Sequence, residues 1–154
     1  MKKQKPNKGF TLIEIILTVG LLAIVIGIGL YYSQGTQIRN DIYAQAKYLT
    51  SNLRLAQSNA SSGKTDKANA IHLENDSYTL FIGTSYTPSD TRNYTETLPP
   101  TIKIEDISLN GGGSNIIFSS PNGETENYGN LNLTATEINK SINITINNLG
   151  AINY

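Results

Sequence analysis

The sequence predicts an α+β protein, in which a long N-terminal α-helix packs on a small antiparallel β-rich head. Three observations predict this class. An uninterrupted apolar run covers residues 10–32, apolar residues recur every three or four positions over residues 33–60, and alternation with a period of two begins after residue 65. The first two patterns are those of a transmembrane helix and an amphipathic helix, and the third is typical of short strands.

The apolar run from Phe10 to Tyr32 has the length of a transmembrane helix. Its 23 residues would span roughly 34 Å as an α-helix, which is enough to cross a bilayer core. Tyr31 and Tyr32 end the run in a position where interfacial aromatic residues are common. The positive-inside bias predicts a cytoplasmic N-terminus and an extracytoplasmic head, because four lysines precede the run: Lys2, Lys3, Lys5 and Lys8.

Three interpretations of this segment compete, and two of them do not explain Glu14. A cleaved secretory signal could use the small residues at Ser33 and Gly35, but its apolar core usually has only roughly 7–15 residues. An ordinary signal-anchor helix fits the length and the flanking charges. Neither explains Glu14, because a carboxylate in an apolar span costs about 2.5–3.5 kcal/mol at the bilayer centre and less near its surface. Unless it reaches water at the cytoplasmic face, Glu14 is a candidate functional residue.

The residues from Lys8 to Glu14, KGFTLIE, followed by the long apolar run, resemble the type III signal of type IV pilins and pseudopilins. The resemblance implies that residues 1–9 are a leader peptide, that a prepilin peptidase cleaves after Gly9, and that the new N-terminal residue, Phe10, is N-methylated. It also implies that Glu14 helps to recruit and register subunits. Cleavage would create an α-amine, which is a natural partner for a carboxylate in a low-dielectric setting. We expect this pair to join two subunits.

The apolar run departs from the pattern of many major pilins, because it lacks their helix-kinking proline. Gly27 and Gly29 are present in this part of the run instead. Glycine weakens a helix by about 1 kcal/mol relative to alanine, so we expect the helix to bend or melt here. Close packing of helices through small residues is the alternative.

Beyond Gly35 the apolar residues fall on one helix face. They predict one continuous helix from about residue 11 to about residue 58, whose second half, residues 33–60, packs on the head. Turn-forming residues at 61–64 would end it. Two helices broken at residues 33–36 are the alternative. The apolar face consists of Ile38, Ile42, Ala46, Leu49, Leu53, Ala56 and Ala60.

The predicted head, residues 65–154, contains six to eight short strands. Two hairpins are predicted, one joining 70–73 to 78–82 and the other joining 142–146 to 151–154. Residues 83–100, rich in Thr, Tyr, Ser and Pro, are predicted to form a loop. The remaining predicted strands cover residues 101–104, 106–109, 115–118 and 130–133, with a turn at 120–123.

The second half of the chain resembles the H-type minor pseudopilins of type II secretion and the related minor pilins of type IV pili. A strand ending at Phe118, the Pro121–Gly123 turn and the terminal hairpin carry this resemblance. It implies a subunit that is first held in the inner membrane and then assembled into a pilus or pseudopilus. The implied partners are other pilin or pseudopilin subunits, the prepilin peptidase, the assembly platform protein and its ATPase.

Composition restricts the chemistry of the chain. The absence of cysteine excludes disulfides and thiolate metal sites, and the single histidine leaves no histidine cluster. Nothing arranges a nucleophile for catalysis, so we expect neither an enzyme nor a cofactor. After residue 9 the chain has eight basic and twelve acidic residues, a net charge of −4. Nucleic acid is therefore an unexpected partner.

Three features of the head invite a functional interpretation. His72 alternates with Ile71 and Leu73 and is predicted to lie on an outward strand face. The glycines at 111–113 are not followed by the Lys-Ser/Thr of a phosphate loop, so they predict a flexible turn. Four acidic residues could ligate calcium but lack the spacing of a calcium loop, so we expect no metal: Asp106, Glu124, Glu126 and Glu137.

Two other function classes stay open. A filament-tip adhesin or DNA-uptake subunit would act through the head, and Lys64 and Lys67 are the residues to test by salt-dependent binding. A signal-anchored extracytoplasmic domain unrelated to pili would tolerate Glu14→Leu. The pilin interpretation predicts instead that this variant fails to incorporate.

Overall fold

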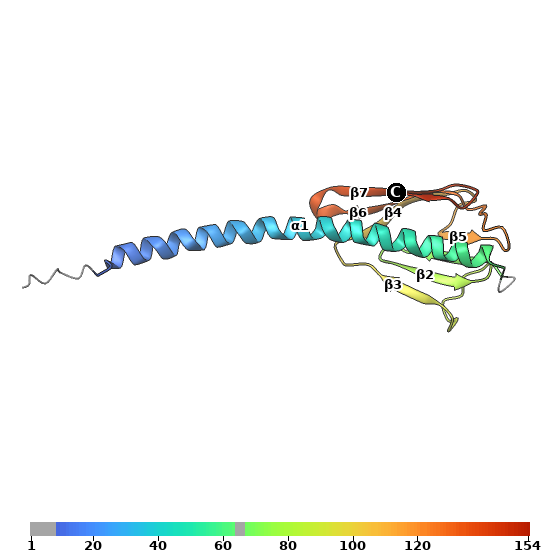
Figure 1. Ribbon diagram of the computed structural model, residues 1–154, viewed down its shortest axis with the longest axis horizontal. Helices are drawn as coiled ribbons and strands as arrows, with labels where there is room; N and C mark the ends of the chain where they lie inside the picture. The colour runs from blue at the N-terminus through green and yellow to red at the C-terminus, as the bar shows by residue number, and fades with distance from the viewer. Residues whose placement is uncertain (1–8, 64–66) are drawn as a thin grey trace, which may run out of the picture. The chain divides into compact units, whose positions relative to one another are not determined.

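The computed structural model describes residues 9–63 and 67–154 of the chain (Figure 1). They belong to two compact units, an N-terminal unit, Met1–Thr36, and a head unit, Gln37–Tyr154. Helix α1, Leu12–Ser61, has no break at residues 33–36, so the alternative of two helices is wrong. The predicted α+β class, with a long N-terminal helix and antiparallel strands, is confirmed. Most of the predicted leader, residues 1–8, lies outside the described residues, as does Lys64.

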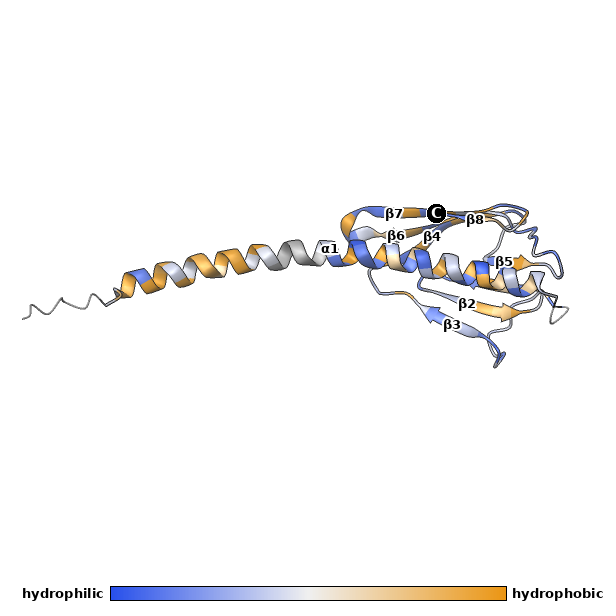
Figure 2. Ribbon diagram, viewed as in Figure 1, coloured by the Kyte–Doolittle hydropathy of each residue, from blue (hydrophilic) through white to orange (hydrophobic). Residues whose placement is uncertain are grey.

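Within the head unit, α1 is amphipathic and buries one face. Figure 2 shows hydrophobic and hydrophilic residues alternating along this part of the helix. Gly63 follows the helix with a φ of +62°, the left-handed conformation that commonly ends an α-helix. Of the predicted apolar face, Ile38 is partly buried and the other six residues are fully buried, namely Ile42, Ala46, Leu49, Leu53, Ala56 and Ala60.

The first sheet has four antiparallel strands in the order β3-β2-β1-β5. These are β1, Asn69–Leu73, β2, Ser77–Ile82, β3, Tyr94–Thr97, and β5, Asn115–Phe118. The predicted hairpin between β1 and β2 is confirmed, with Leu73 opposite Tyr78.

The second sheet has four antiparallel strands in the order β4-β6-β7-β8. The predicted terminal hairpin is formed by β7 and β8, in which Ile146 pairs with Ile152. The short 3-10 helix η1, Thr136–Ile138, connects β6 to β7. The four strands are β4, Lys103–Leu109, β6, Gly129–Ala135, β7, Lys140–Ile146, and β8, Ile152–Asn153.

Two predictions about the strands are wrong. The predicted loop over residues 83–100 contains β3, an edge strand whose residues lie mostly exposed and therefore show no apolar alternation. The two segments predicted at 101–104 and 106–109 are not separate strands, because β4 begins at Lys103 and continues to Leu109. Its pairing with β6 shifts register between Glu105 and Ser108, and Asp106 has a φ of +51°. Because of this irregularity, the apolar residues change from even-numbered to odd-numbered positions within the strand. The sequence pattern therefore looks like two strands instead of one.

One hydrophobic core joins α1 to both sheets. Figure 1 shows the head-unit part of α1 running along the strands of both sheets. Because the strand residues on the helix side are apolar, burial of α1 holds the two sheets together around it. The largest fully buried side chains of the core include Leu49 and Leu53 of α1, Ile71, Tyr78 and Phe118 of the first sheet, and Ile104, Leu131 and Leu133 of the second sheet.

Candidate functional site

The predicted cleavage site lies immediately before helix α1. Gly9 and Phe10 are exposed and have no regular secondary structure, and the side chain of Phe10 is 81% exposed. A Cβ atom built on Gly9 would meet no heavy atom within 4 Å. The packing of the described chain therefore does not require glycine at this position. An extended, accessible backbone with a glycine is what a peptidase needs in order to bind and cut a chain.

Thr11 caps the first turn of the helix. Its backbone oxygen accepts hydrogen bonds from the N–H groups of Glu14 (3.1 Å) and Ile15 (3.3 Å), and its Oγ1 accepts from the same N–H of Glu14 at 3.3 Å. Thr11 and Glu14 thus occupy the positions of the Ser/Thr and Glu of a capping box. The carboxylate also lies at the positive end of the helix macrodipole, which favours a negative charge there.

Most of the N-terminal unit exposes apolar surface. Leu12–Gly29 has a mean hydropathy of 2.6, and this helical segment is long and apolar enough to cross a membrane. Its side chains are exposed on every side of the helix, so nothing in the described chain covers them. A helix that is hydrophobic all round needs a membrane or other helices around it. This segment therefore fits a single-pass membrane anchor.

Glu14 is the one charged residue of the N-terminal unit among the residues that the structure describes. It lies in an open groove of about 350 Å³ on the helix surface, beside Leu17, Leu21 and the hydroxyl groups of Thr11 and Thr18. The hydroxyl of Thr18 donates back to the carbonyl oxygens of Glu14 and Ile15, both at 2.9 Å. No described residue forms an ion pair with Glu14. A cation supplied from outside could bind in this groove.

Gly27 and Gly29 both lie within α1, and the helix is continuous through them. A Cβ atom on either glycine would meet nothing within 4 Å, so the described chain does not need small residues here. The predicted bending on assembly and the alternative of close helix packing both stay predictions.

The acidic residues considered for calcium do not gather in one place. Asp106 lies in the irregular part of β4 and Glu137 in η1, whereas Glu124 and Glu126 lie in the connection between β5 and β6. Among the described residues, no three acidic or histidine side chains come close enough to hold a metal ion. The glycines at 111–113 all have positive φ values and lead into a strand, as a turn does.

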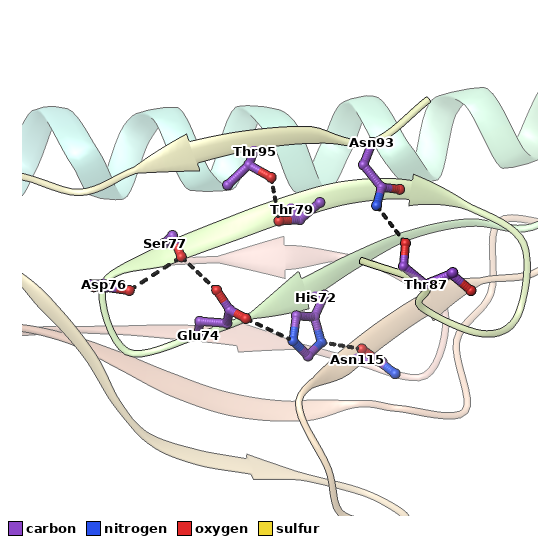
Figure 3. A network of polar contacts seen from close by, with 9 residues as sticks. All are labelled: His72, Glu74, Asp76, Ser77, Thr79, Thr87, Asn93, Thr95 and Asn115. Atoms are coloured by element: carbon purple, nitrogen blue, oxygen red, sulfur yellow. Dashed lines mark hydrogen bonds and ion pairs between the residues drawn. The ribbon is translucent and has the colours of Figure 1, made fainter. Parts of the chain in front are cut away.

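His72 holds a loop against the first sheet rather than facing open solvent. Its ring stacks on Tyr86 at 4.0 Å between centroids. Its Nδ1 lies 2.7 Å from Asn115 Oδ1, and its Nε2 lies 3.6 Å from Glu74 Oε1 (Figure 3). Glu74 in turn accepts a hydrogen bond from Ser77 at 2.8 Å. The sequence pattern gave no signal for this cluster, because Tyr86 comes from the connection between β2 and β3.

Comparison with known proteins bears on the N-terminal unit. A family model described as the prokaryotic N-terminal methylation motif matches residues 4–30, which include the predicted cleavage site, Glu14 and Gly27. Searches of curated proteins and of solved structures found no significant match to the chain.

Proposed function

We propose that the chain is a structural subunit of a filament. The premise is the methylation motif followed by an apolar helix, which indicates a type IV pilin-like protein that a prepilin peptidase processes. We assign it to the minor pilins or pseudopilins of a type IV pilus or a type II secretion pseudopilus. The observation that carries the proposal is the position of Gly9 and Phe10, exposed before an apolar helix whose first turn contains Glu14. The proposal gives the chain no catalytic role.

Processing converts the precursor into a subunit that can polymerise. The peptidase cuts after Gly9 on the cytoplasmic side, where the leader lysines hold the N-terminus by the positive-inside bias. The apolar helix stays attached to the head unit and waits in the membrane. It then leaves the lipid and packs against the helices of neighbouring subunits, through close contact and buried apolar surface.

Glu14 specifies how far neighbouring helices are staggered. An unpaired carboxylate in the apolar interior of a filament would cost about 2.5–3.5 kcal/mol, by analogy with membrane insertion. The α-amine of a neighbour's Phe10, freed by cleavage, offsets much of this cost when it lies beside the carboxylate. Only one stagger brings the two groups together, so the charge pair selects the register.

The first experiment measures the mass of the N-terminal peptide from membranes that also contain a prepilin peptidase. We expect a peptide that begins at Phe10 and carries one additional methyl group. An uncut N-terminus would refute the processing route and favour a plain signal-anchored domain, whereas a start at Thr36 would indicate an ordinary secreted protein.

A second experiment separates assembly from processing. Glu14→Gln removes the charge with little change in shape, and Glu14→Leu also removes the polar group. We expect both variants to be cut after Gly9 and both to be strongly depleted from sheared filaments relative to the membrane fraction. Leu17→Met, one helical turn further along, is the matched control and should incorporate normally. Normal incorporation of Glu14→Leu would show that Glu14 does not set the stagger between subunits.

A further inference from the structure

The head unit separates positive and negative charge between its helix and its strands. Over residues 37–61, α1 carries Arg39, Lys47 and Arg54 against the single acidic residue Asp41. The described residues from 67 to the C-terminus contain four basic and nine acidic residues. The helix of the head unit therefore has a net positive charge, whereas the strands and their connections together have a net negative charge.

Two of the three basic residues of α1, Arg39 and Lys47, belong to an exposed ridge that also contains aromatic side chains. The third, Arg54, lies outside this ridge and donates a hydrogen bond to the backbone oxygen of Ile152 at 3.1 Å. Arg39, Tyr43 and Lys47 are spaced by four residues, so they lie one above the other on the helix surface. Tyr43 is 49% exposed, and Tyr48, which directly follows Lys47, is 63% exposed. Lys140 adds a further cation, with its Nζ 5.5 Å from the centre of the Tyr43 ring. We call these five residues the basic ridge.

An acidic cleft lies elsewhere on the head unit, where three connections meet. Its volume is about 380 Å³, and its walls come from the ends of β4 and β5, the β5–β6 connection and the β7–β8 turn. Backbone hydrogen bonds fix these walls to one another, from Ser119 to Glu124 (2.8 Å), from Thr125 to Asn148 (3.0 Å) and from Asn110 to Tyr128 (2.7 Å).

The cleft combines negative charge with apolar surface. Glu124 and Glu126 flank the buried Thr125, and their carboxylates have no hydrogen-bond or ion-pair partner among the described residues. Tyr128 and Leu149 line the same cleft and are both exposed. A lysine or arginine side chain has the matching chemistry, because its apolar stem can cover the tyrosine and leucine while its cationic end reaches the carboxylates.

We propose that the acidic cleft of one copy of this chain receives the basic ridge of a second copy, with Lys47 as the cation. The cleft cannot be filled by the ridge of its own chain. Its Leu149 carbonyl accepts a hydrogen bond from Gln57 at 3.2 Å, and Gln57 lies ten residues beyond Lys47 on α1. That separation is about 15 Å along the helix, well beyond the reach of a lysine side chain.

The contact joins two different surfaces, so it is heterologous. The pair of copies keeps one free ridge and one free cleft, at its opposite ends, and such contacts extend into an open filament unless the rotation between copies closes a ring. The inference rests on the proposed function, because the N-terminal helices would hold the head units at the local concentration that a weak polar contact needs. Exposed ion pairs of this kind weaken as salt is added.

The absence of cysteine from the chain permits a direct test. Ala44 lies exposed between Tyr43 and Tyr48 and Asn148 lies exposed at the cleft, so Ala44→Cys and Asn148→Cys place thiols on the two surfaces without changing any charge. The full-length double variant is produced with the prepilin peptidase and the assembly proteins and then oxidised mildly. We expect a ladder of dimers, trimers and longer species, whereas either single variant forms no ladder.

A matched control and a charge exchange make the outcome specific. Ala44→Cys combined with Thr97→Cys, on the exposed edge strand β3, should give no ladder. Adding Lys47→Glu to the cross-linking pair should lower the ladder about two- to fivefold, and adding Glu124→Lys as well should restore much of it.

Four results would overturn the proposal. Dimers without longer species would show a two-fold contact instead, and cross-links only to another protein would assign the cleft to a different partner. The absence of any cross-link in chains that begin at Phe10 and sediment as filaments would refute the head contact and leave the proposed function intact. Uncut chains that do not cross-link would refute both.

Discussion

The Oγ1 atom of Thr11 accepts a hydrogen bond from the backbone N–H of Glu14 at 3.3 Å, which makes the proposed assembly residue part of the N-terminal cap of helix α1. The carboxylate therefore projects from a turn that is fixed by its own backbone. The proposed pairing of subunits would benefit from this arrangement, because a carboxylate on a fraying turn would have to be ordered before it could bind a cation.

The first prediction concerns this cap. Thr11→Val removes the hydroxyl at nearly constant shape, and loss of an N-cap costs about 1 kcal/mol, so the first turn should open about fivefold more often. Hydrogen exchange at the amides of Glu14 and Ile15, measured in detergent micelles, should accelerate by that factor. Thr11→Ser keeps the acceptor and should exchange like the unmodified chain. Equal exchange rates in all three proteins would show that the cap does not order the turn.

A second prediction compares two leucines on the same helix. Leu53 is completely buried in the core, whereas Leu55 is 49% exposed. Leu53→Ala should lower the free energy of unfolding by about 2–5 kcal/mol, because it leaves a cavity between α1 and the sheets. Leu55→Ala should change it by less than about 0.5 kcal/mol. Tyrosine fluorescence during urea unfolding can report both values, since the chain contains no tryptophan. Equal losses in the two variants would contradict the assigned helix face.

The third prediction is a loss of stability in alkali. Burial raises the pKa of Tyr78 from 10.0 to about 12, although a hydrogen bond from Asn52 at 2.8 Å acts in the opposite direction. The folded chain therefore holds this proton more tightly than the unfolded chain. The resulting stabilisation is complete below pH 10 and is lost as the pH rises through about 12.

Tyr78→Phe tests this pH dependence. The unmodified chain should lose up to roughly 3 kcal/mol of stability between these pH values through this group, at about 1.4 kcal/mol for each pH unit. The variant should lack that part of the loss. It should also be less stable at neutral pH by about 1 kcal/mol, because the amide of Asn52 loses its partner. Identical slopes in the two proteins would show that Tyr78 does not titrate as assigned.

A fourth prediction concerns the close approach of β4 and β6. Gly129 has a φ of +156°, and a Cβ atom there would collide with the carbonyl oxygen of Ser108. Gly129→Ala should therefore destabilise the head unit by more than about 3 kcal/mol, since backbone has to move. Gly112 also has a positive φ but faces open space, so Gly112→Ala should cost only about 1 kcal/mol. Thermal unfolding of the two variants would distinguish these effects.

The functional assignment depends on residues that are adjacent in the chain. Gly9, Phe10, Thr11 and Glu14 lie within six consecutive positions, and the apolar run follows directly. Local physical chemistry is enough to interpret such a segment, because hydropathy and helix capping depend on near neighbours. The sequence therefore predicted the α+β class, the apolar helix, its amphipathic continuation and the two hairpins.

Features that depend on distant residues could not be predicted in this way. The edge strand β3 has no apolar alternation, and only its pairing with β2 identifies it as a strand. Likewise, Tyr86 reaches His72 because a long connection folds back over the first sheet.

Features that depend on neighbouring residues could be predicted from the sequence, whereas features that depend on contacts between distant residues could not. The sequence by itself determined the N-terminal methylation motif, the membrane-length helix and the charge of each segment. Only the tertiary structure decided that the strands form two sheets around one helix, and that Glu124, Glu126, Tyr128 and Leu149 share a cleft away from the basic ridge. Those contacts join parts of the chain that become neighbours only when a common core is buried.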